Sequence, residues 1–274
     1  MPAQHPFAPL VLGAVPSVAA WLSRWIERSR CERGRRAEQR QRDYQTRKAA
    51  RLANAPPHEV VRLIEHAERV RARIAEVRPI DPAWRVLEVG SGPHGNVFFL
   101  GHEGAIGVDP LADLYGALFP MWQRRARTVR ASGEALPFGD ACFDLVISDD
   151  VIDHAAHPET ILDEIARVLR PGELLYLTVH VHHPVYSVAA ALHATWNALG
   201  VRWEIDPFAD HTTHFTAARI RAALGGLPLR IVLEDDGIGS ARAQARRLPL
   251  DGPVNLSRRV WFKNARFEVV AIRR

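Results

Sequence analysis

The stretch Val86-Leu-Glu-Val-Gly-Ser-Gly-Pro-His-Gly95 decides the fold of this 274-residue chain. An apolar run suited to a strand ends in a turn whose glycines allow sharp bends and close backbone approach. The next apolar run, residues 105–108, ends at Asp109. A strand, a glycine-rich turn and an acid after the following strand are typical of a parallel α/β sheet.

Further along the chain, strand and helix patterns alternate, which indicates a parallel sheet with crossover helices. An amphipathic helix is predicted from about residue 57 to Pro79. The predicted strands are 85–89, 105–108, 128–131, 143–148, 174–179, 229–233 and 267–272, and the predicted helices are 95–100, 111–122, 158–169, 184–200 and 215–224. A polar loop is expected at 203–214, and a surface excursion at 241–259.

Two domains are predicted, an N-terminal appendage over residues 1–56 and a main domain over 57–274. Within the appendage, residues 7–22 are uncharged and mostly apolar, but they are too short to span a bilayer and contain Pro9 and Pro16. They are expected either to pack on the main domain as a helix or to anchor at a membrane surface, together with the Arg-rich stretch 24–51. Acids are mixed into that stretch, so we expect a solvated helix rather than a nucleic-acid arm.

The overall composition adds three expectations. The formal net charge is +5, but Lys48 and Lys263 are the only lysines, and an arginine skew of this kind is weak evidence for nucleic acid. The two cysteines, Cys31 and Cys142, offer no disulfide framework and no zinc-binding spacing. A reducing, cytoplasmic location fits this cysteine usage.

The glycine turn and Asp109 together predict a site for adenosine, with the acid on the ribose hydroxyls. Gly90-Ser-Gly-Pro-His-Gly95 matches the dinucleotide pattern GxGxxG, which is a weak signal alone. NAD and S-adenosylmethionine both contain adenosine. Glu88 favours the second, because a carboxylate there would repel a pyrophosphate and could face the ammonium of a methionine.

Four sequence blocks then carry a family resemblance. They are 87–92 (LEVGSG), 107–109 (GVD), 133–138 (GEALPF) with 143–146 (FDLV), and 164–172 (EIARVLRPG). In this order they resemble the class I S-adenosylmethionine-dependent methyltransferases of small-molecule type. The resemblance implies a Rossmann-like seven-stranded sheet, mostly parallel with the last strand antiparallel. It implies S-adenosylmethionine as cofactor, and with the preceding arguments it predicts cofactor contacts from Glu88, Gly90, Ser91, Gly92, Gly95, Asp109, Pro110, Ser132, Gly133, Glu134, Ala135 and Asp149.

The chain departs from the family pattern at two positions. Ser132 stands where related sequences often have an aspartate for the adenine amino group, so adenine would rely more on the backbone of Gly133 and Glu134. Gly172-Glu173 replaces a pair of glycines, and no function is attached to that turn.

The acceptor of the methyl group is expected at the carboxyl ends of the fourth and fifth strands, where open α/β sheets place ligands. These strands lead into Ser148–His154 and into His180–Tyr186, and residues 210–214 add further histidines. His154 is the first candidate base, with Asp150 or Asp153 to orient it. His182, His183 and His214 rank second. Asp149, Asp150, His211 and His214 could instead bind a divalent metal, but no spacing is diagnostic and no metal ion is expected.

The predicted function is therefore methyl transfer to an oxygen of a small hydroxylated metabolite or glycan-like acceptor. An insertion at about 181–214 would form the substrate side. Two alternatives stay open: an NAD(P)-dependent Rossmann oxidoreductase, and a non-catalytic, membrane-docked partner protein. No nucleic-acid partner is expected, because the main domain has no stripe of interleaved basic and aromatic residues.

Overall fold

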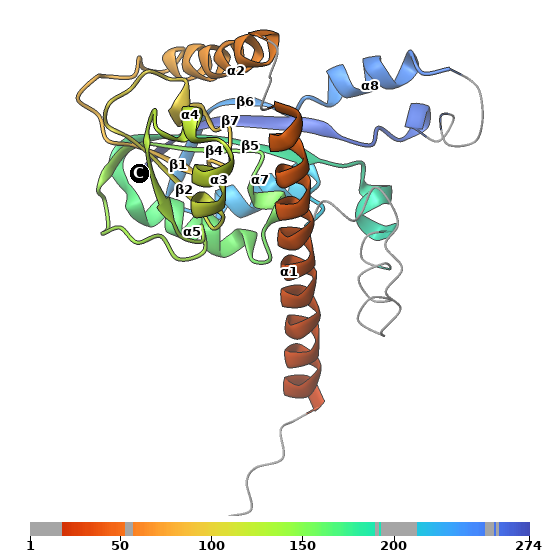
Figure 1. Cartoon of the computed structure of the whole chain (residues 1–274). Coiled ribbons are helices and arrows are strands. Elements are labelled where there is room, and N and C mark those ends of the chain that lie inside the picture. Colours follow the sequence, from red (N-terminus) through yellow and green to blue (C-terminus); the bar gives the residue numbers. More distant parts are fainter. Residues whose placement is uncertain (1–17, 53–56, 190–191, 193–212, 250–254, 256–257) are drawn as a thin grey trace, which may run out of the picture.

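The computed structural model describes residues 18–52, 57–189, 192, 213–249, 255 and 258–274. Its centre is a seven-stranded sheet in the order β3-β2-β1-β4-β5-β7-β6 (Figure 1). The strands are β1 (Val86–Val89), β2 (Ala105–Asp109), β3 (Arg127–Arg130), β4 (Phe143–Asp149), β5 (Leu169–Val181), β6 (Leu229–Asp235) and β7 (Ala265–Arg273). The β7 strand is antiparallel to both of its neighbours, and the other pairs are parallel. The predicted fold class is confirmed.

Helices cover both faces of the sheet, which makes a three-layer domain. One apolar cluster joins the sheet to α5 (Pro158–Val168) and α7 (Ala217–Gly225). The other joins it to α2 (Pro57–Ala75), α3 (Ala112–Leu118), α4 (Pro120–Gln123) and the 3-10 turn η1 (Asn96–Phe98). The central strand β1 is buried at every residue, as a strand covered on both faces should be.

Several element boundaries differ from the sequence prediction for local reasons. Only η1 forms where a helix over 95–100 was expected. The helix predicted over 111–122 is divided at Phe119, because Pro120 has no backbone N–H to continue the first helix and begins α4 instead. The β5 strand begins five residues earlier than predicted, directly after α5, and Gly172 accommodates its turn with φ +84°. The excursion over 241–259 contains most of a further helix, α8 (Ile238–Arg246).

The charged N-terminal stretch forms one long helix, α1 (Val18–Leu52), which stands beside the sheet and extends beyond it (Figure 1). Its C-terminal half contacts the domain, where Gln45 is buried and Ala49 packs on the second apolar cluster. No helix in the described part of the chain has the length and apolar content needed to cross a membrane. Residues 7–17, most of the predicted segment 184–200 and the 203–212 loop lie outside the described residues, and so does the domain boundary near residue 56, which stays a prediction.

Candidate functional site

The glycine turn after β1 forms a tight loop whose geometry favours glycine at three positions. Gly90 and Gly92 adopt left-handed backbone conformations, with φ of +74° and +53°. A Cβ atom at Gly95 would collide with the Glu88 carboxylate and with the backbone of Ser91. Ser91 is buried against Gly107 of β2, where a side chain would likewise collide with it. The loop is therefore packed tightly, with its backbone near the carboxyl ends of β1 and β2.

Glu88 holds this loop from within the core. Its carboxylate accepts hydrogen bonds from the Asn96 backbone N–H (2.9 Å), the Asn96 side-chain amide (2.8 Å) and the Val97 backbone N–H (2.9 Å). Burial raises the pKa of Glu88 to about 7. Glu88 thus fixes the position of η1. The predicted contact of Glu88 with a methionine ammonium stays a prediction.

Asp109 lies at the end of β2, beside the same loop. Its two carboxylate oxygens accept hydrogen bonds from the backbone N–H groups of Gly92 (3.0 Å) and Leu111 (2.8 Å). Burial raises its pKa to about 6, and nearby Glu38 adds to the shift. This position, at the end of the second strand and against a glycine turn, is where the ribose of an adenine cofactor is held in such folds. Pro110 follows it, exposed.

The loop after β3 forms the third wall of this region. Ser132 is exposed, and its hydroxyl accepts a hydrogen bond from the Glu134 N–H (3.2 Å). Glu134 in turn accepts a hydrogen bond from the His157 N–H (2.9 Å), at the start of α5. Gly133 has no room for a side chain against Val89. Ala135 is exposed. The residues expected to bind adenine are thus brought together with Asp109 at one edge of the sheet.

The α1 helix runs along this edge. Its Gly34 faces Ala156, its Gln41 side chain hydrogen-bonds the Tyr115 hydroxyl of α3, and its Glu27 pairs with His157 (2.9 Å). Glu38, between Gly34 and Gln41, lies near Asp109. The helix therefore crosses from the loop after β4 to the helix after β2, over the ends of the strands that carry the glycine turn and Asp109.

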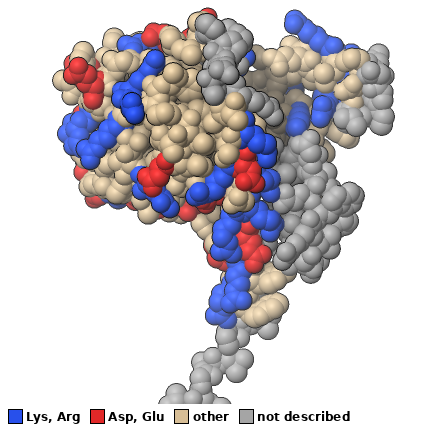
Figure 2. Space-filling view, viewed as in Figure 1, with Lys and Arg blue, Asp and Glu red and all other residues tan. Residues whose placement is uncertain are grey.

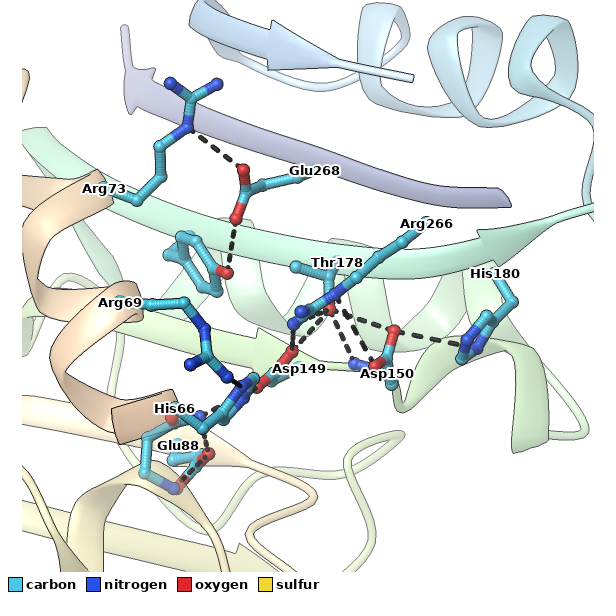
Figure 3. Close-up of polar contacts among 12 residues, drawn as sticks. His66, Arg69, Arg73, Glu88, Asp149, Asp150, Thr178, His180, Arg266 and Glu268 are labelled. Carbon is cyan, nitrogen blue, oxygen red and sulfur yellow. Dashed lines mark hydrogen bonds and ion pairs between the residues drawn. The ribbon is translucent and has the colours of Figure 1, made fainter. Parts of the chain in front are cut away.

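At the end of β4, Asp149 is the centre of a dense polar cluster (Figure 3). Its oxygens contact His66 of α2 (2.6 Å), Arg266 of β7 (2.5 Å) and Thr178 of β5 (2.6 Å). Asn96 donates a further hydrogen bond at 3.0 Å. These partners outweigh burial and hold the pKa of Asp149 well below its usual range, so it is ionised at neutral pH.

Asp150 comes next in the chain and faces the other side of this cluster. It has an unusual left-handed backbone for a non-glycine residue, with φ +55°. Its N–H donates to the Thr178 hydroxyl (2.9 Å), and its carboxylate lies 3.7 Å from His180 Nδ1 and 3.7 Å from Arg266 Nε. Burial raises the pKa of Asp150. Strained backbone of this kind is often retained at functional sites.

His180 connects Asp150 to a second, fully buried carboxylate. Its Nδ1 lies 3.5 Å from Asp153, whose side chain is 0% exposed. The interaction with Asp153 raises the pKa of His180 against the effect of burial. His180 itself stays half-buried at the carboxyl end of β5. A half-buried imidazole held between two carboxylates can take up a proton from a nearby group.

The histidines selected from sequence lie elsewhere around this cluster. His154 is exposed at the end of the 3-10 turn η2 (Ile152–His154). His183 accepts a hydrogen bond from the Val185 N–H (3.4 Å) and lies edge-on to Phe262. His214 lies next to buried His182, with ring centroids 4.9 Å apart. Their predicted roles stay predictions.

Five residues of the cluster were not selected from sequence: His66, Asn96, Thr178, His180 and Arg266. His66 lies 83 residues before its partner Asp149, and Arg266 lies 117 residues after it. Only the fold brings these segments together. A signal was present for His180, which follows the same strand as His182 and His183, but spacing alone gave no reason to rank it first.

One group of residues could supply three metal ligands. The donor atoms of Glu27, Cys31 and His157 lie within 4.8 Å of one another. All three are at least partly exposed, and the Glu27–His157 contact is already an ion pair. Among the described residues no such group includes Asp149 or Asp150. His211, named in the metal alternative above, lies outside the described residues.

Comparisons with known proteins agree with this geometry. The family described as "Methyltransferase domain" matches residues 87–177, which include the glycine turn, Asp109, Asp149 and Asp150. An uncharacterized methyltransferase of Mycolicibacterium vanbaalenii is 38% identical over 99 residues, 35% of this chain and 39% of that protein. The chain thus matches only about 39% of this curated relative's length.

Solved structures share the fold at low identity. The 4+2 cyclase SpnF has a TM-score of 0.52 at 16% identity, covering 77% of this chain and 80% of that one. A geranyl diphosphate C-methyltransferase from Streptomyces coelicolor, solved with Mg2+, geranyl diphosphate and S-adenosyl-L-homocysteine, has a TM-score of 0.54 at 13% identity, covering 77% and 79%. At such identities the likeness concerns the fold alone. Residues 87–177 are thus similar in sequence to methyltransferase domains, and the sheet of the whole domain has the fold of the solved methyltransferases.

Proposed function

We propose that the protein transfers a methyl group from S-adenosylmethionine to an oxygen of a small hydroxylated acceptor, a metabolite or a glycan-like molecule. The observation that carries the proposal is the position of His180 between Asp150 and Asp153, at the same end of the sheet as the glycine turn and Asp109. The donor's adenosine would lie against Asp109 and the 132–135 loop. Its sulfonium end would then point toward the end of β4.

The reaction needs little more than alignment and removal of one proton. The acceptor oxygen attacks the methyl carbon in line with the carbon–sulfur bond, so that the new O–C bond forms as the S–C bond breaks and S-adenosylhomocysteine leaves. His180 would accept the hydroxyl proton, and the two carboxylates would stabilise the resulting imidazolium. Asp153 acts through His180 and is a positioning residue. Arg266 and Asp150 offer a cation and a carboxylate to the polar groups of the acceptor.

Binding of the donor is tested first. Calorimetry of the full chain should detect S-adenosylhomocysteine and no NADH. NADH binding without S-adenosylhomocysteine binding would instead favour the oxidoreductase alternative. A folded protein that binds neither would contradict the proposal at its first step.

The base is tested through the pH profile, with release of S-adenosylhomocysteine measured over a panel of hydroxylated acceptors. His180→Gln should lower kcat at least about a hundredfold while S-adenosylhomocysteine affinity is kept. Because a base must be unprotonated, activity should rise with pH through the raised pKa of His180. Asp153→Asn should lower that pKa and move the rise to lower pH. His154→Gln is the competing variant: if it removes turnover and His180→Gln does not, the base is His154.

A further inference from the structure

A surface with exposed apolar side chains lies beyond the polar cluster around Asp149. It is formed by the segment after β5 and the segment before β7. The segment after β5 exposes Val185 (42%), Val188 (64%) and Leu192 (62%), and the segment before β7 exposes Val260 (65%) and Trp261 (40%). We call these five residues the apolar tip. The two segments are in contact, since the Tyr186 hydroxyl lies 3.4 Å from the Trp261 carbonyl oxygen and the His183 ring packs on Phe262.

The neighbourhood of the apolar tip is strongly basic. Residues 238–263 contain six cationic residues and a single acid, Asp251. The cations, which we call the basic flank, are Arg242, Arg246, Arg247, Arg258, Arg259 and Lys263. Arg242, Arg246 and Arg247 are exposed on and just after α8, and Figure 2 shows basic side chains in that part of the molecule. By contrast, residues 184–192 contain no charged side chain.

We propose that the apolar tip and the basic flank form a docking surface for an anionic lipid bilayer. Exposed aliphatic side chains beside a tryptophan and a tyrosine suit the boundary between headgroups and acyl chains. Cations around them are attracted to anionic headgroups. A groove within the same surface is lined by apolar, cationic and amide side chains: Ala241, Ala245, Leu248 and Phe262, Arg258 and Lys263, and Gln244 and Asn264. It combines apolar and cationic lining within one site.

This surface differs from the N-terminal segment 7–51, for which membrane contact was predicted from sequence. It also borders the proposed acceptor site, because His180 belongs to β5 and Arg266 to β7. A protein docked in this way would present the polar cluster near the headgroups. The proposal concerns binding alone, so it can fail while methyl transfer stands, and the reverse.

Sedimentation of the full chain with vesicles tests the proposal. The chain should bind vesicles of mixed phosphatidylglycerol and phosphatidylcholine, less at higher salt, and should bind pure phosphatidylcholine at least about tenfold more weakly. Val260→Asp and Trp261→Ala should each weaken binding to the anionic vesicles by about tenfold or more. Val188→Asp makes the same test on the segment after β5.

Matched controls lie on other parts of the surface. Met121 is 70% exposed on α4, and Trp21 is 59% exposed on α1. Met121→Asp and Trp21→Ala should leave vesicle binding unchanged, and circular dichroism checks that every variant is folded. Absence of binding by the unaltered chain, or equal loss with the Trp21 and Trp261 variants, would overturn the proposal. A stable dimer that Val260→Asp converts to monomer would also overturn it, because the apolar tip would then be an interface between copies.

Discussion

At the scale of single residues, Glu88 has an observed structural role and a predicted role in binding the ligand. All of its described hydrogen bonds tie it to Asn96 and Val97. Its pKa rises from its ordinary value of 4.5 to about 7, because burial disfavours the charge more than these donors favour it. A bound ammonium would remove that penalty. The loop is therefore expected to become more stable once a positively charged ligand lies beside it.

Glu88→Gln tests both roles. When the pKa of an acid is higher in the folded state than in the unfolded state, the free energy of unfolding falls as pH rises from the unfolded pKa to the folded pKa. For Glu88 this range runs from about 4.5 to about 7. The cost at neutral pH is about 3 kcal/mol. Urea titrations across this range should show a flatter pH dependence for the variant. If Glu88 faces the ammonium, the variant should also lose about tenfold in S-adenosylhomocysteine affinity but bind methylthioadenosine, which has no ammonium, as before.

Asp149 is expected to contribute far more to stability than a surface ion pair. Asp149→Asn removes a nearly buried charge and leaves Arg266 and His66 without it, so the free energy of unfolding should fall by about 2–3 kcal/mol. Asp113→Asn is the matched control, because its pair with Arg130 is exposed and should be worth under about 0.5 kcal/mol. Since the pKa of Asp149 is lowered, its contribution should vanish as pH falls below its ordinary value near 3.8. Equal losses in the two variants would contradict this account.

At the scale of elements, the sequence predicted what repeats along the chain and missed what depends on distant packing. The buried run of β4 and the apolar face of α5 follow from local patterns, and both are confirmed. The division of one predicted helix at Pro120 could have been read from the proline. In contrast, the meeting of His66, Thr178 and Arg266 at Asp149 joins four elements. No local pattern carries that information.

The glycine turn gives the element-scale prediction. Gly95→Ala should disturb the start of η1, because the added Cβ would collide with Glu88 and with the Ser91 backbone. We expect S-adenosylhomocysteine affinity to fall at least about tenfold. Gly116→Ala is the control: nothing lies within 4 Å of a Cβ there, and alanine should stabilise α3 by about 0.5–1 kcal/mol. Unchanged affinity in Gly95→Ala would mean that the loop can relax around the methyl group.

At the scale of the whole molecule, the parallel α/β class follows from the alternation of patterns, and the seven strands with an antiparallel last strand follow from the family resemblance. The position of α1 follows from neither. Sequence predicted a solvated helix for residues 24–51. The structure forms this helix, mostly exposed, and lays one face of it on the domain through Gly34, Gln41 and Gln45. This face carries few side chains, and they are small or amides rather than apolar. The hydrophobic periodicity of the sequence therefore did not reveal the contact. Such a contact buries little apolar surface, so α1 should detach more easily than the core elements unfold.

Hydrogen exchange can test this arrangement directly. Because α1 crosses the edge that carries Asp109 and the glycine turn, S-adenosylhomocysteine bound there should lie under the helix. Saturating ligand should therefore slow exchange of the amides around Gly34–Gln45 at least about tenfold, because the ligand would bind fully only while α1 lies on the domain. Amides of α8, which follows β6 and contacts β7, serve as the internal control and should not change. If α1 stays unprotected while the 90–97 loop becomes protected, the helix takes no part in holding the cofactor and the ligand lies open to solvent.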